Sequence, residues 1–82
     1  MERQSVLNLK FIRELRIKKE ISTEDMSILL GYEGYQAYYY KERGIRNMSV
    51  EDIAKIAVIL DVPIKKLFFE NIVTEKVIKQ LA

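Results

Sequence analysis

The residues of this chain with the most telling chemistry lie around positions 35–47, and their side chains suit contacts with nucleic acid. The amide of Gln36 can pair with N6 and N7 of adenine at the same time, and the small Ala37 can pack against the methyl group of thymine. Phenol groups can donate to a base or a phosphate, and guanidinium groups neutralise phosphates. Each candidate has an ordinary alternative as a solvated surface residue. The candidate set is Thr23, Tyr35, Gln36, Ala37, Tyr39, Tyr40, Arg43, Arg46 and Asn47.

Two short predicted helices position these residues. The segment 22–30 has helical spacing, begins with a capping box of Ser22 and Asp25, and stops at a glycine. A glycine-bearing turn over 31–34 leads to a second helix over 35–43, which also stops at a glycine. Two short helices joined by a tight glycine turn form a helix-turn-helix, and the second helix of that motif can enter the major groove of DNA.

Three consecutive tyrosines, at positions 38–40, restrict how the second of these helices can pack. Three successive helical residues span about 200° of arc, so they cannot all face one core. Tyr38 is predicted to point inward, together with Met26 and Leu30 of the preceding helix. Tyr40 is then predicted to face a partner, with its phenol donating to a phosphate or a base.

The rest of the chain predicts three further helices around the same core. A first helix covers 6–19, a fourth follows the capping box that begins at Ser49, and a fifth covers 63–69. The pattern over 70–82 is ambiguous between strand and helix. The sequence therefore predicts an all-α domain of five helices over 1–69, followed by a short C-terminal extension.

The composition excludes several classes of protein. The 82 residues carry 14 basic and 12 acidic side chains, for a net charge of +2, and include no Cys and no His. Metal sites made of thiolates or imidazoles, and catalysis by either group, are therefore excluded. No apolar run approaches the roughly 18 residues of a membrane span, and the N-terminus does not resemble a signal peptide. We expect a cytoplasmic protein that is not an enzyme, needs no cofactor or metal, does not enter a membrane and implies no small-molecule ligand.

An ordered set of residues resembles a known family over roughly three quarters of the chain. Those residues are Ile12, Leu15 and Arg16, then Ile21, Ser22, Met26, Leu30 and Gly31, then Tyr38, Lys41, Glu42 and Gly44, then Ser49, Ile53, Ile56, Ala57, Leu60, Val62, Leu67 and Phe68. The chain from 9 to 69 resembles the Cro/repressor-type helix-turn-helix family, also called lambda-repressor-like. Its turn and its fifth helix are similar to those of small regulators from phages and mobile elements of Gram-positive bacteria. The chain departs from the family at Ser27, where Ala is usual, and at the apolar Ile28 and Leu29, where polar residues are usual.

The resemblance implies a structural ion pair between Arg16 and Glu42, which would tie the first helix to the third. It also implies a transcriptional regulator, with repression as the expected mode, that binds double-stranded DNA as a homodimer on a palindromic operator. The extension over 70–82 is expected either to build the dimer or to fold back over Ile28 and Leu29. The alternative function is a protein-interaction module, such as an antitoxin or anti-regulator, that binds another protein through its apolar surface.

Overall fold

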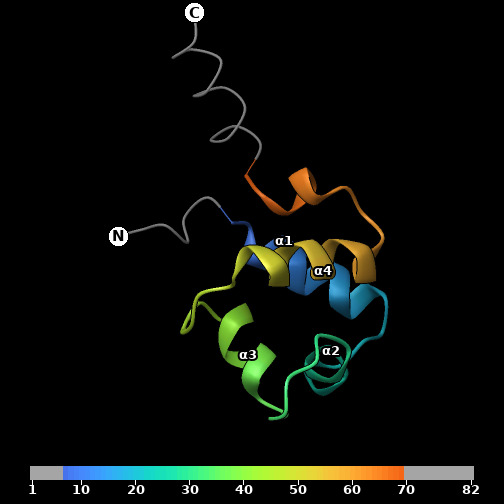
Figure 1. Ribbon diagram of the computed structural model, residues 1–82. Coiled ribbons are helices and arrows are strands. Elements are labelled where there is room, and N and C mark those ends of the chain that lie inside the picture. The colour runs from blue at the N-terminus through green and yellow to red at the C-terminus, as the bar shows by residue number, and fades with distance from the viewer. Residues whose placement is uncertain (1–6, 70–82) are drawn as a thin grey trace, which may run out of the picture.

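The computed structural model describes residues 7–69, and the chain in this range is all-helical, as the sequence predicts. In the view of Figure 1, α2 and α3 lie below α1 and α4, and the last element, η2, lies above them. The predicted extension over 70–82 lies outside the described residues. In chain order the elements are α1 (Leu9–Lys18), α2 (Thr23–Leu29), α3 (Ala37–Glu42), α4 (Val50–Leu60) and the 3-10 helix η2 (Ile64–Leu67).

The predicted fifth helix, over 63–69, is reduced to one turn of 3-10 helix. Pro63 precedes that turn with extended backbone (ψ 143°), and the chain is extended again at Phe68 (ψ 158°). There the carbonyl of Leu67 accepts a hydrogen bond from the N–H of Asn8 (2.8 Å), and the two segments form an isolated antiparallel bridge. Pairing with the residues before α1 therefore ends the helix after a single turn.

Short polar side chains begin three of the four α-helices. Ser22 accepts a hydrogen bond from the backbone N–H three residues on (3.0 Å) at α2, and Ser49 and Asp52 form a reciprocal capping box at α4. α1 starts after Asn8, later than predicted, because the Asn8 side chain caps it by accepting from a backbone N–H (3.1 Å). Each cap satisfies a donor that the first turn of a helix leaves unpaired.

The core is built from all four α-helices and is closed by η2. Tyr38, Met26 and Leu30 face inward as predicted, and Tyr38 is fully buried. The apolar Ile28 and Leu29 of α2 remain 61% and 56% exposed among the described residues. The buried apolar residues are Leu7, Ile12, Met26, Leu30, Tyr38, Met48, Ile56, Ala57, Leu60 and Leu67.

A buried ion pair ties α1 to α3. Arg16 donates to both carboxylate oxygens of Glu42, at 2.8 and 3.1 Å, and to the carbonyl of Ile21 at 2.6 Å. The hydroxyl of Tyr38 donates to the same carboxylate at 2.8 Å, and burial, followed by the charge of Glu42, raises the pKa of Tyr38. The structure thus brings into contact the two residues that the family resemblance pairs, and it anchors the end of α3 to the core.

Candidate nucleic-acid interface

A buried serine joins α2 to the beginning of α3. The hydroxyl of Ser27 donates to the carbonyl of Tyr35 (2.9 Å) and accepts from the N–H of Tyr38 (3.0 Å). It therefore satisfies one of the N–H groups that the first turn of α3 leaves unpaired. These two bonds hold Tyr35 in the turn, and the first carbonyl that accepts from the next turn of α3 is that of Gln36, from the N–H of Tyr40 (3.1 Å). α3 therefore begins at Ala37 and not at residue 35 as predicted.

Sequence reasoning did not identify Ser27 as a residue that positions the site. The signal was a serine where the similar family usually has alanine, directly after the inward-facing Met26. A hydroxyl at a fully buried position needs hydrogen-bond partners, and the nearest unpaired backbone groups are those of the turn that follows. The serine at position 27 therefore fixes the start of α3 through its hydrogen bonds to the backbone of Tyr35 and Tyr38.

Residues of α3 and of its two flanks form one connected group on the surface. Tyr40 donates to the amide oxygen of Gln36 (3.0 Å), and its ring meets that of Tyr39 edge to face, with centroids 5.7 Å apart. Arg43 lies over the Tyr39 ring, 5.2 Å from its centroid, and Arg46 lies over the Tyr40 ring at 5.7 Å. The structure therefore brings together five of the nine predicted site residues.

A hollow of about 340 Å³ separates α3 from the first turn of α2. Thr23 and Glu24 come to it from α2, so Thr23 joins the candidate surface from a second helix. Glu24 was not predicted to lie here, and its carboxylate would repel a phosphate. It would restrict where a nucleic-acid backbone could pass. The remaining lining residues are Tyr35, Gln36, Tyr39 and Tyr40.

The nine predicted site residues all reach the surface, although to different degrees. Tyr35 is 65% exposed and Tyr39 is 39% exposed. Ala37 is half-buried, so only part of its methyl group is open to a partner. Arg46 and Asn47 lie in the loop between α3 and α4, and both are exposed. The other exposed members are Gln36 and Arg43, and the other half-buried members are Thr23 and Tyr40.

A second polar cluster, which the sequence did not predict, fixes α3 against α4. Lys41, in the last turn of α3, donates to Asp52 at 2.6 Å and to the hydroxyl of Tyr32 at 2.8 Å, and Tyr32 in turn donates to Asp52. Asp52 is also the third residue of α4 and completes its capping box with Ser49, so the cluster joins the turn before α3 to both helices. Lys41 is thus a structural cation, and its pairing removes it from the basic residues open to a phosphate.

The same cluster lowers the pKa of Asp52. Burial alone would raise that pKa, but hydrogen bonds from Lys41, Tyr32 and the backbone N–H of Ser49 outweigh burial and bring it to about 2. Burial would lower the pKa of Lys41, but its bonds to Asp52 and Tyr32 raise it. Burial and the bond to Asp52 raise the pKa of Tyr32. All three shifts favour one state, with Lys41 protonated, Asp52 ionised and Tyr32 neutral.

Acid is expected to destabilise the protein through Asp52. The carboxyl has a folded-state pKa of about 2 and an ordinary value of 3.8, so it contributes stability above pH 3.8 and loses it as the pH falls toward 2. The contribution at neutral pH is about 2 kcal/mol. Denaturant unfolding at a series of acidic pH values measures it. Asp52→Asn should flatten the acid limb, whereas the exposed control Glu14→Gln should not. An Asp52→Asn protein with the parent's acid sensitivity would contradict the assignment.

Residues 7–69 contain neither a membrane-spanning helix nor an acidic metal site. None of these helices is long and apolar enough to cross a membrane. No cluster of three or more acidic side chains in the same range could hold a metal ion.

Compared with known proteins, the sequence matches no protein-family model and no curated protein.

Proposed function

We propose that the protein is a sequence-specific DNA-binding transcriptional regulator, and that α2, the following turn and α3 act as its helix-turn-helix. The observation that most supports this is the connected group of Gln36, Tyr39, Tyr40, Arg43 and Arg46. An amide able to read a base stands there beside two cations able to neutralise phosphates. Residues at the beginning of a recognition helix contact base edges in the major groove.

In this proposal Gln36 reads adenine with an amide that Tyr40 holds in place. The amide oxygen has two lone pairs, and the Tyr40 hydroxyl uses one of them. The second lone pair and the NH₂ group remain to pair with N6 and N7 of one adenine. Because the Tyr40 bond already restricts the rotation of the amide, less side-chain entropy is lost on binding.

Phosphate contacts are assigned to the residues that flank α3. Arg43 and Arg46 are exposed, and a guanidinium that lies over a tyrosine ring keeps its N–H groups directed outward from its edge. Thr23, Tyr35 and Asn47 would add neutral contacts. Contacts of this kind position the protein on the duplex, whereas base contacts select the sequence.

The proposal extends to architecture and assembly. The helices would form a lambda-repressor-like domain over 1–69, with η2 as its fifth helix and an extension over 70–82. Two copies would bind a palindromic operator, each reading a half-site about one helical turn from the other. The bound pair would block polymerase and so act as a repressor in the cytoplasm, without a cofactor or a small-molecule ligand. This description also suits the small phage and mobile-element regulators that the chain resembles.

Exposed apolar side chains favour the alternative, a protein-interaction module such as an antitoxin or anti-regulator. Ile28, Leu29, Val50 and Val58 are between 56% and 81% exposed. A gathering of such residues on a small domain marks a surface that binds protein. In that case the fold would be kept while contacts with DNA became secondary.

Selection of fragments from a random DNA pool tests the leading proposal, and a salt titration separates it from the alternative. The selected fragments should share a two-fold symmetric sequence, and affinity should fall steeply with salt, because phosphate neutralisation releases counterions. Arg43→Ala should make the slope shallower. The control Lys65→Ala, on η2 and away from α3, should keep the parental slope (Figure 1). A pool that shows no enrichment at low salt would reject DNA binding.

A further inference from the structure

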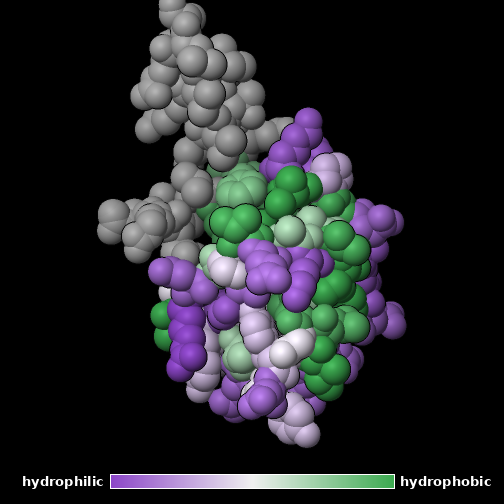
Figure 2. Space-filling model, in the orientation of Figure 1, coloured by the Kyte–Doolittle hydropathy of each residue, from purple (hydrophilic) through white to green (hydrophobic). Residues whose placement is uncertain are grey.

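Apolar side chains follow one side of α4, and none of residues 7–69 covers them. Val50, Ala54 and Val58 are spaced four residues apart, which places them in a row along the helix. Val50 is 81% exposed and Val58 is 79% exposed. Figure 2 shows hydrophobic residues in a band that runs from η2 across α4 to α2. We call Val50, Ala54 and Val58 the α4 stripe.

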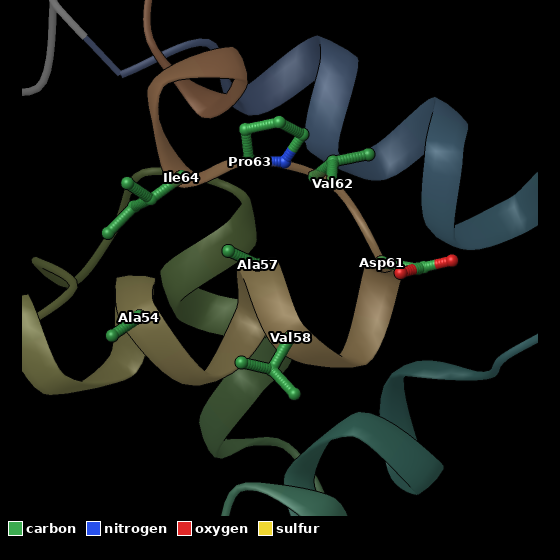
Figure 3. Close-up of a pocket in the computed structure, with 7 residues that line it drawn as sticks. All are labelled: Ala54, Ala57, Val58, Asp61, Val62, Pro63 and Ile64. Carbon is green, nitrogen blue, oxygen red and sulfur yellow. The ribbon is translucent and has the colours of Figure 1, made fainter.

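The α4 stripe separates two hollows. One, of about 480 Å³, lies between α4 and the segment 61–64, and Figure 3 shows Ala54 and Val58 beside it, with Ile64 opposite. The other, of about 290 Å³, lies toward α2 and is lined in part by Leu29. Ala54 and Val58 border both hollows. The stripe and the hollows therefore form one continuous and largely apolar surface.

We propose that a second copy of this chain covers this surface, with the two α4 helices packed antiparallel about a two-fold axis near Ala54. The α4 stripe is itself symmetric, with one valine four residues before Ala54 and another four residues after it. Val50 of each copy would therefore meet Val58 of the other, as a self-complementary contact requires. The small Ala54 at the axis lets the two helices approach closely. The inference rests on the proposed function in one respect, that a palindromic operator is bound by a pair, and it names the surface on which the pair forms.

Charge complementarity supports the antiparallel orientation. Glu51 and Lys55 flank the stripe and form an exposed ion pair within α4, with 3.9 Å between Nζ and the carboxylate oxygen. Two antiparallel helices present these charges in opposite order, so Glu51 of each copy lies beside Lys55 of the other. Parallel helices related by a two-fold axis would place the two charge pairs on opposite sides of the contact, where they would not meet. The same surface is therefore complementary to itself in both its apolar and its charged residues.

The size of the surface indicates a weak dimer. Seven residues line the larger hollow and five line the smaller, with Ala54 and Val58 in both. With Val50 the surface has eleven residues, about half or fewer of the roughly 20–30 that each partner contributes to a standard interface. We therefore expect a dissociation constant in the micromolar range or above without DNA. An operator with two half-sites would hold the copies at a high effective concentration.

Charge reversal tests the proposal in a way that a folding defect cannot imitate. Sedimentation equilibrium without DNA compares the parent with Glu51→Lys and Lys55→Glu. Each variant alone should associate about tenfold more weakly, because like charges then face each other twice across the axis. An equal mixture of the two variants should recover parental association, because opposite charges face each other again. Recovery on mixing would require that these two positions meet between copies.

Two further comparisons make the result decisive. Val58→Glu should abolish association, whereas Ile17→Glu, at a 58% exposed position on α1, should leave it unchanged. Circular dichroism should show that both variants stay folded. Association that survives Val58→Glu but is lost on Val77→Glu with Ile78→Glu would show that the extension joins the copies, and would overturn the proposal. A parent that remains monomeric at millimolar concentration would overturn it too. Because no DNA is present, either failure leaves the DNA-binding proposal separately testable.

Discussion

Replacing Glu42 with alanine is expected to lower the free energy of unfolding by about 3–5 kcal/mol. The side chains of Arg16 and Glu42 are only 10% and 3% exposed, so the substitution would leave a guanidinium in the core without its countercharge. The hydroxyl of Tyr38 would lose its acceptor as well, and the link from α1 to the end of α3 would be lost. Chemical denaturation at neutral pH measures the change.

A double-mutant cycle identifies the origin of this effect. Arg16→Met alone should also be costly, because the Glu42 carboxylate would then be buried without a cation. The double variant, Arg16→Met with Glu42→Ala, should be less destabilised than the two single changes together, since it leaves no unpaired charge. Glu51→Ala is the matched control, because Glu51 belongs to an exposed ion pair, and it should stay within about 0.5 kcal/mol of the parent. A cycle in which the two changes simply add would contradict coupling between Arg16 and Glu42.

Features that depend on a few neighbouring residues could be predicted from the sequence. Ser22 and Ser49 cap α2 and α4 because a hydroxyl reaches a backbone N–H three residues away, whatever the rest of the chain does. Gly31 and Gly44 end their helices with φ of 85° and 80°, a conformation that glycine adopts without a steric penalty. The arc that three successive helical residues cover required at least one of the three tyrosines to leave the core, and Tyr39 is 39% exposed.

Features that depend on distant segments could not be predicted in this way. α3 starts late because Ser27, one helix earlier, bonds the turn, and η2 stops after one turn because its backbone meets the residues before α1. The cluster of Tyr32, Lys41 and Asp52 joins three elements, and no spacing or capping pattern in the sequence connects its members. Each of these contacts is decided by which elements pack together, and helical spacing and capping patterns carry no information about that.

The candidate surface also combines features that the sequence predicts with features that it does not. Spacing alone placed Gln36, Tyr39 and Tyr40 on the outer side of a short helix, and the structure keeps them at the surface. The bond between Tyr40 and Gln36, and the stacking of Arg43 and Arg46 on tyrosine rings, depend on side-chain conformations that the sequence does not specify. Those contacts turn a set of candidate residues into a specific hypothesis about how one base is read.

Gln36→Ala is expected to weaken binding to the selected operator by about 1–3 kcal/mol for each half-site and to relax the preference for adenine there. The fold should be unaffected, because Gln36 makes no side-chain capping bond to α3 and is exposed. Arg46→Ala should instead weaken binding to all sequences by a similar amount and reduce the dependence on salt, since phosphate contacts carry no sequence information. Titrations of the operator and of a scrambled duplex, at two salt concentrations, separate the two effects.

Tyr40→Phe tests the specific arrangement of the reading group. The substitution keeps the ring under Arg46 and removes only the hydroxyl that bonds the Gln36 amide. Discrimination between adenine and other bases should therefore fall, by less than in Gln36→Ala, while binding to the scrambled duplex stays at the parental level. In the combined variant, Tyr40→Phe should add nothing to the loss caused by Gln36→Ala, because both changes act on the same contact. If the two losses add fully, the tyrosine contacts DNA by itself and does not act through Gln36.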